Sequence, residues 1–212
     1  MLANVMFEKF LQGGPIMWPM LLTFLVALAV VLERVFWWTR EGRRREPARL
    51  DAVYEALQRG DRAAASKLAS ASKDPLLRTI YHGLHHAHAS LQGAMRLAGG
   101  VELQRAGRFL GVLDTIVTLA PLLGLLGTVT GIMHSFAFVG NEEVAAIKVS
   151  GGIAEALIAT ACGLAIAIFC LIPFNYYNGR LARLQFELET AMSNVELLDE
   201  SRRDGAKPAE AR

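Results

Sequence analysis

Three long apolar stretches dominate the hydrophobic pattern of this 212-residue chain, of which 53% of residues are hydrophobic. They cover residues 15–38, 113–139 and 151–177. A helix needs roughly 20 apolar residues to cross the hydrocarbon core of a bilayer, which is about 30 Å thick. The pattern therefore predicts an all-α, multi-pass membrane protein with three transmembrane helices.

The polar parts of the chain are also predicted to be helical. Residues 1–14 favour a short amphipathic helix, ended by a Gly-Gly-Pro sequence, and residues 140–150 a turn. Within 39–112, Gly60 and Asp61 separate the two helices of a hairpin, and Asp74 precedes a proline that begins another helix. From Leu91 the helical pattern continues without proline into the second apolar stretch, which predicts one long helix.

Residues 178–200 extend the third apolar stretch as a helix, and 201–212 are expected to be disordered. Apolar residues in this extension alternate at spacings of three and four, which is a heptad stripe that requires neighbouring helices. The stripe consists of Leu181, Leu184, Leu188, Ala191, Val195 and Leu198.

The distribution of basic residues predicts the orientation. Of the 22 lysines and arginines, 13 lie between Arg40 and Arg108 and six more between Arg180 and Arg212. By the positive-inside rule, the N-terminus and the 140–150 turn are outside, whereas 39–112 and the C-terminus are inside as cytoplasmic helical extensions. The net charge of +2 thus reflects membrane topology and does not indicate a nucleic-acid partner.

Glu155 is the most informative residue, because it is a carboxylate inside the third apolar stretch. A charged side chain at the centre of a membrane helix costs at least about 2.5–3.5 kcal/mol, so it must face a protein partner or a water-filled path. Glu155 is therefore the first candidate for function.

Small and hydroxylic residues of the second stretch recur at helical spacings of three and four. Two explanations stay open: close helix packing, with Gly127 and Gly131 as a GxxxG contact, or a pore or socket for another helix. A second small stripe, from Gly152 to Ala167, lies in the third stretch. The first stripe consists of Asp114, Thr118, Pro121, Gly124, Thr128, Gly131 and Ser135.

The hydroxyls of Thr128 and Thr160 are predicted to lie at similar depths in the membrane. At 1.5 Å per residue, Thr128 lies roughly 4 Å outward of the centre of its helix, and Thr160 lies at nearly the same depth. Glu155 is then about a turn and a half further out. Proton transfer usually needs a titratable group near mid-depth, and the sequence offers none there besides Glu155 and the innermost Asp114, so either Glu155 is the relay or a partner helix supplies a carboxylate.

Two segments resemble the signatures of the MotA/TolQ/ExbB proton-channel family: residues 119–133, with the sequence LAPLLGLLGTVTGIM, and 152–163, with the sequence GIAEALIATACG. Residues 13–19 (GGPIMWP) and the pair Glu33–Arg34 resemble ExbB in particular. One departure is Gly151, which stands where many relatives have proline.

The resemblance implies a ring-forming homo-oligomer, a pentamer, in a bacterial inner membrane. Its central pore would hold the membrane helices of an ExbD-like single-span protein, and a TonB-like protein would transmit the motion to the outer membrane. The family's pore residues fall on Thr128, Thr160 and Glu155. Secondary pore-face candidates are Asp114, Thr118, Gly131 and Ser135.

The other candidate sites favour ordinary structural roles. His82, His85, His86 and His88 are interpreted as a solvated helix face, although His82 and His86 at i and i+4 could share a metal. Cys162 and Cys170 lie about 12 Å apart along one helix and are expected to be core residues, not a disulfide. No nucleophile–base pair or cofactor motif predicts an enzyme.

Three functional hypotheses follow. The first is an energy-coupling proton-channel subunit of ExbB type, the second a TolQ-like subunit for envelope constriction, and the third a non-conducting oligomeric scaffold. The sequence leaves the choice between protons and sodium ions open.

Overall fold

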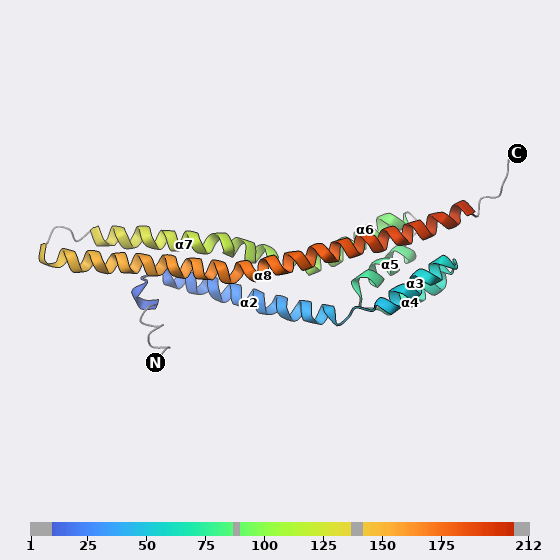
Figure 1. Ribbon diagram of the computed structural model, residues 1–212, viewed down its shortest axis with the longest axis horizontal. Coiled ribbons are helices and arrows are strands. Elements are labelled where there is room, and N and C mark those ends of the chain that lie inside the picture. The colour runs from blue at the N-terminus through green and yellow to red at the C-terminus, as the bar shows by residue number, and fades with distance from the viewer. Residues whose placement is uncertain (1–9, 87–89, 137–141, 206–212) are drawn as a thin grey trace. The chain divides into compact units, whose positions relative to one another are not determined.

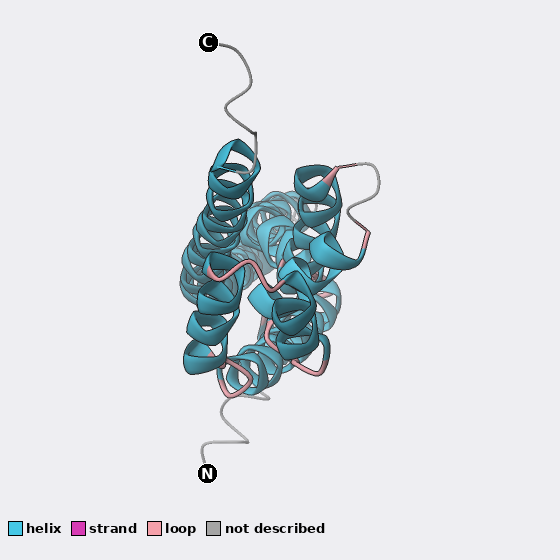
Figure 2. Cartoon of the chain, turned by 90° about the vertical axis from the view of Figure 1, so that its right-hand side faces the viewer, coloured by secondary structure: helices cyan, strands magenta, loops and turns pink. Residues whose placement is uncertain are grey.

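The computed structural model describes residues 10–86, 90–136 and 142–205, and for 142–148 and 202–205 it describes the backbone alone. Throughout these ranges the chain forms helices joined by short loops, with no strand (Figures 1 and 2). Residues 1–9 of the expected amphipathic helix, and residues 206–212 of the tail, lie outside the described part. The helices are α2 (Met17–Gly42), α3 (Pro47–Gln58), α4 (Arg62–Ser70), α5 (Pro75–His85), α6 (Leu91–Ala106), α7 (Leu110–Phe136) and α8 (Glu142–Gly205).

Three of these helices are long and apolar enough to cross a membrane: α2, α7 and the Val149–Ser201 part of α8. The prediction of an all-helical chain with three such helices is therefore confirmed. The chain divides into two compact units. We call Met1–Arg34 with Phe109–Tyr177 the apolar unit, and Val35–Arg108 with Asn178–Arg212 the polar unit.

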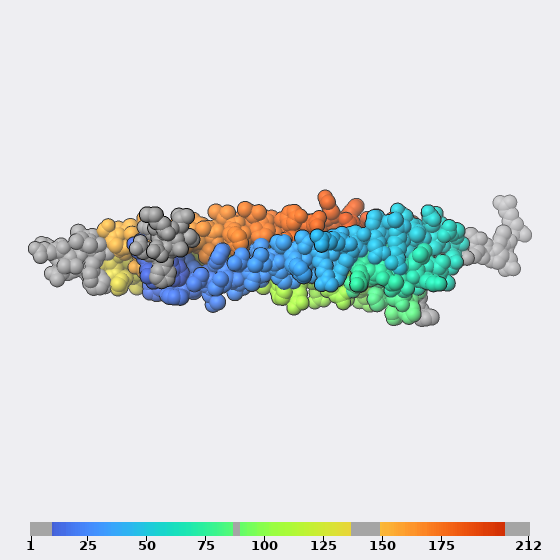
Figure 3. Space-filling model, turned by 90° about the horizontal axis from the view of Figure 1, so that it is seen from below, coloured from blue at the N-terminus to red at the C-terminus, as the bar shows by residue number. Residues whose placement is uncertain are grey.

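The apolar unit is a three-helix assembly of α2, α7 and the first part of α8. Its core is built from small and medium apolar side chains of all three helices, and the rings of Phe24 and Phe169 meet there at 5.5 Å. In the space-filling view, α2 (blue) lies directly against α8 (orange) along this unit (Figure 3). Leu22, Leu122 and Leu157 point outward and are each more than 60% exposed. An outer surface of this kind is suited to lipid.

The contact between α7 and α8 depends on glycines. A Cβ added at Gly163 would lie 2.5 Å from the Ala120 carbonyl oxygen, and one added at Gly124 would lie 3.1 Å from the Thr160 Cα. One added at Gly131 would lie 3.1 Å from the Gly152 carbonyl oxygen. The neighbours are backbone atoms, which cannot move aside as a flexible side chain can. The two backbones thus approach closely, as at small-residue contacts between membrane helices.

The polar unit is a bundle in which α3, α4, α5 and α6 share a core with one face of the last part of α8, whose other face is exposed. Val195 of α8 is fully buried among Val53, Ile80 and Met95. The middle of the predicted heptad stripe, from Leu184 to Val195, is at most 3% exposed. The prediction that this stripe packs against helices is confirmed, and the helices that cover it belong to the same chain.

Helix starts in the polar unit follow the sequence signals. Asp61 caps α4 by accepting a hydrogen bond from the Ala64 N–H at 2.8 Å, and the preceding Gly60 has a φ of +80°. Asp74 caps α5 by accepting from the Leu76 N–H at 2.9 Å. The helix starts predicted at Asp61 and at Asp74 are confirmed, and in both a carboxylate satisfies an otherwise unpaired N–H of the first turn.

The expectation of one continuous helix from Leu91 into the second apolar stretch is wrong. Helix α6 ends at Ala106 and α7 begins at Leu110. Phe109, between them, has a φ of +65°, which an L-residue other than Gly, Asn or Asp rarely adopts. The Phe109 ring lies 5.8 Å from the guanidinium carbon of Arg34, whose side chain is buried and bonded to Glu33. The interruption between α6 and α7 therefore coincides with a tertiary contact. The sequence did not indicate this interruption, because the segment contains no proline.

Helix α8 is longer than the sequence indicated at both ends. It begins at Glu142, inside the turn predicted for 140–150, and it continues to Gly205, inside the tail predicted to be disordered from 201. Alanine, glutamate and valine near its start are compatible with helix, so the glycines there do not stop it.

Replacing Asp74 with alanine is predicted to lower the free energy of unfolding by about 2–3 kcal/mol. Its carboxylate is buried and also accepts a hydrogen bond from the Glu46 N–H at 2.9 Å, so its loss leaves two N–H groups without their acceptor. Thermal unfolding of the detergent-solubilised chain measures the effect. Asp61→Ala, which removes an exposed cap, is the control and should cost only about 1 kcal/mol. Equal losses would contradict this account.

Replacing Gly163 with alanine tests the glycine contact. The added methyl group would meet the Ala120 carbonyl oxygen, so we expect a loss of about 1–3 kcal/mol and a lower unfolding temperature. Gly179→Ala in the same helix is the matched control, because nothing lies within 4 Å of its added Cβ. That variant should gain about 0.5–1 kcal/mol through the helix preference of alanine. A neutral Gly163→Ala would show that the two helices do not depend on close approach.

Candidate functional site

The two threonines predicted for the pore lie on either side of the α7–α8 contact. Both are half-buried. Thr128 follows Gly127, and Thr160 follows Ala159. Gly127 and Ala159 face each other, because a Cβ added at Gly127 would lie 2.5 Å from the Cβ of Ala159. The Thr160 hydroxyl donates to the Gly124 carbonyl oxygen across the contact at 3.2 Å, and the Thr128 hydroxyl donates to Leu125 of its own helix at 2.6 Å. The two hydroxyls therefore occupy neighbouring levels of the apolar unit.

The other stripe residues of α7 do not share one environment. Gly131 and Ser135 are buried against α8, and a Cβ added at Gly152 would lie 3.0 Å from that of Ser135. Asp114 and Thr118 are exposed. The outer part of the stripe thus belongs to helix packing, while its inner part faces away from the helix contact.

The separation follows from helix geometry. A pattern that repeats every seven residues drifts by about 20° per heptad around a straight α-helix, and the stripe covers three heptads. The drift totals about 60°, which is enough to carry the stripe from the exposed face at Asp114 to the buried face at Ser135.

Glu155 faces the loop that precedes α2. A Cβ added at Gly14 would overlap the Glu155 carboxylate and lie 2.6 Å from its Cδ, and Gly14 has a φ of +74°. Position 14 therefore requires glycine both for its backbone conformation and for the space that the carboxylate occupies. In the sequence, Gly14 stands out as a helix breaker and as part of the segment that resembles ExbB, and no local pattern connects it with a residue so distant in the chain.

A cavity of about 520 Å³ opens beside the Glu155 carboxylate. One of its lining residues is His134, the last basic side chain of α7. His134 lies at the outer end of α7, away from the mid-depth region for which only Glu155 and Asp114 were expected as titratable groups. The sequence contains a signal for His134 as a site residue, since it follows Gly131 by about one helical turn in an apolar stretch. The cavity is lined by Gly14, Pro15, Ile16, Pro19, Thr130, His134 and Glu155.

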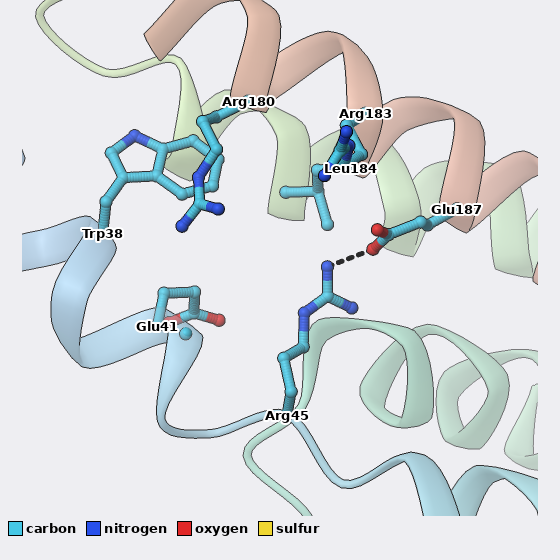
Figure 4. A pocket seen from close by; sticks show the side chains of 8 residues that line it. Trp38, Glu41, Arg45, Arg180, Arg183, Leu184 and Glu187 are labelled. Atoms are coloured by element: carbon cyan, nitrogen blue, oxygen red, sulfur yellow. Dashed lines mark hydrogen bonds and ion pairs between the residues drawn. The ribbon is translucent and has the colours of Figure 1, made fainter. Parts of the chain in front are cut away.

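A second cavity, of about 260 Å³, lies in the polar unit, where the end of α2 faces α8 (Figure 4). The Arg180 guanidinium lies over the Trp38 ring at 5.5 Å, and Arg45 forms an ion pair with Glu187. Arg183 and Glu41 also line it, so three arginines face two carboxylates. Basic and aromatic residues of this kind commonly anchor the ends of membrane helices.

The histidine cluster of α5 lies on the surface of the polar unit. The His82 and His86 rings stack at 5.9 Å, and both are exposed. They line a groove that also contains Glu102, where burial raises the pKa of the carboxyl although Arg78 and Arg105 beside it act in the opposite direction. Among the described residues, which do not include His88, no three potential ligands are grouped to hold a metal.

A family model covers both signature segments. The family model described as the MotA/TolQ/ExbB proton channel family matches residues 70–190. The protein named ExbB-like 1 of Synechocystis sp. is 35% identical to the chain over 176 residues, which cover 79% of the chain and 68% of the relative. ExbB-like 3 of the same organism is 30% identical over 194 residues, or 89% of the chain and 92% of the relative.

A TolQ protein is similar over a shorter range. The Tol-Pal system protein TolQ of Haemophilus influenzae is 40% identical over 93 residues, which cover 43% of the chain and 41% of the relative. The family model spans more than half of the chain, and the three apolar helices fit a membrane protein. The chain therefore belongs to the MotA/TolQ/ExbB proton channel family and is most like its ExbB members.

Proposed function

We propose that this chain is a proton-channel subunit of a bacterial inner-membrane motor, with Thr128, Thr160 and Glu155 along the path. The observation that carries this proposal is the order of polar groups in the apolar unit. The Glu155 carboxylate lies beside a cavity, and the two threonines follow further along the α7–α8 contact. A partly exposed carboxylate inside an apolar span has little reason to exist unless it meets water, an ion or a partner.

A ring of several copies would give these groups a shared path. Asp114 and Thr118 are exposed on α7 of the single chain, where lipid would be an unfavourable neighbour for a carboxylate. In a ring, this face of each copy would turn toward a central axis, and Thr128 would lie at the edge of the same face. The proposed oligomer is a pentamer, and its N-terminus faces outward and its C-terminus faces the cytoplasm.

A partner helix completes the proposed machine. The exposed polar face of α7 offers hydroxyls and small side chains, but Asp114 is the sole carboxylate that its described residues contribute. An ExbD-like single-span protein in the central axis would supply a further carboxylate. Each proton that crosses a potential of 100 mV releases about 2.3 kcal/mol, so several protons per cycle can drive motion between ring and partner. The chain itself then acts as a transport subunit and not as an enzyme.

The system that this motor serves is proposed to be of TonB type, in which a TonB-like protein carries the motion to outer-membrane transport. A Tol-type role in envelope constriction is the second candidate, because TolQ of Haemophilus influenzae is 40% identical to the chain over 93 residues. The partner that copurifies with the chain separates the two candidates. An oligomeric scaffold without conduction would account for the glycines but not for Glu155.

Proton flux into proteoliposomes that contain the chain and its copurified single-span partner tests the proposal. Glu155→Ala and Thr160→Val should each lower the flux by at least about tenfold, since they remove a proton-exchanging group and a hydroxyl without adding bulk. Both variants should still assemble, as measured by the mass of the purified complex. Thr115→Val is the control, because its hydroxyl donates only within α7, to Gly111 at 2.8 Å. Full flux through both variants would remove the proposed roles.

A further inference from the structure

The cavity beside Glu155 contains a second proton-exchanging side chain. His134 reaches it from α7 and Glu155 from α8, and the loop with Gly14 forms a third wall. The remaining lining residues are a threonine and apolar residues, so the two titratable groups of this cavity come from two different helices.

Helix contacts fix the order of the two groups along the membrane normal. Gly131 packs between Gly152 and Ala156, the neighbour of Glu155, whereas Ser135, the neighbour of His134, packs against Gly152. His134 therefore lies about three residues, or roughly 5 Å, closer to the outer end of the helices than Glu155. In the proposed orientation, water outside the cell reaches His134 first, then Glu155, and then the level of Thr160.

The chemistry of the two side chains suits this order. An imidazole can both accept and donate a proton at its two ring nitrogens, and a carboxylate can accept one. A neutral imidazole has one N–H and one unprotonated nitrogen. It can bind a proton from water at one nitrogen and release the proton of the other nitrogen, so that it returns to the neutral form.

We propose that His134 is the outer proton-exchanging group of the path and delivers protons to Glu155. In each step the unprotonated ring nitrogen takes a proton from outer water, the opposite N–H gives up its proton, and the Glu155 carboxylate becomes a carboxylic acid. No other atom changes its bonds. This inference rests on the proposed channel function and assigns a role within it.

The other charged residues near the outer ends of the helices also have to be compared with His134 and Glu155. Among the described side chains, α2 contributes no charged residue before Glu33, and α7 contributes Asp114 only at its inner end. Lys9, Glu142, Glu143 and Lys148 are charged residues of the outer segments, and their side chains lie outside the described part. His134 and Glu155 are therefore the titratable side chains that the described part of the chain places in this cavity.

A structural role for His134 makes a different prediction. A histidine in the last turn of a helix can stabilise the helix through its dipole by about 0.3–1 kcal/mol. If that were its whole role, replacing His134 would lower the unfolding temperature and leave the pH dependence of proton flux unchanged.

The test measures proton flux as a function of outer pH, from 5 to 8, in the proteoliposomes with the full complex. His134→Gln should lower the flux by at least about tenfold and change its dependence on outer pH, because it removes a proton-exchanging group of this cavity. His85→Gln is the matched control, because it removes an exposed histidine that does not line the cavity. Its flux should follow the wild type at every pH.

The outcomes separate the two proposals. If the wild-type complex carries no protons, the proposed function itself fails. If the wild type conducts and His134→Gln follows its pH profile within about twofold, the role of His134 is overturned while the channel function stands. Should His134→Gln fail to assemble, His134→Asn is measured in the same way, and an unchanged profile of that variant would equally overturn the role.

Discussion

Close approach of two backbones is the constraint on which the apolar unit depends. Glycines of α7 and α8 place each helix against backbone atoms of the other, as Gly163 does at the Ala120 carbonyl oxygen. Side chains of ordinary size would hold the helices apart and remove the contact across which the Thr160 hydroxyl reaches Gly124. Membrane helices gain little from hydrophobic association, so this packing and the hydrogen bond are main sources of their specificity.

The same constraint connects structure to the proposed transport. Because the helices cannot separate without losing their contacts, the levels of His134, Glu155 and Thr160 stay in a fixed order. Gly14 adds a second close approach, since the loop before α2 leaves space for the Glu155 carboxylate. Rigid placement of proton-exchanging groups and a surface suited to lipid are what a stationary ring around a moving partner requires.

Much of the fold could be predicted from the sequence, because its signals are local. Apolar length predicted three spans, and carboxylates before helical segments predicted the caps at Asp61 and Asp74. Signals from distant residues were missed: Phe109 breaks a helix beside Arg34, and Gly14 makes room for Glu155. The polar stripe of α7 was predicted to lie on one helix face, because its spacing is nearly that of an α-helix. The small rotation of the pattern in each heptad adds up along the helix and places Asp114 and Ser135 on different faces. The place of His134 beside Glu155 likewise depends on the tertiary structure, because the two residues come from different helices.

The arrangement of several copies decides the central claim, that hydroxyls of neighbouring helices line one hydrated axis. Electron cryomicroscopy of the full-length protein reconstituted with its partner in lipid nanodiscs measures this arrangement directly. The account predicts a ring in which Thr128 and Thr160 of every copy face the axis and the partner helix occupies it. A map in which these threonines face lipid, or in which the copies share no axis, would contradict it.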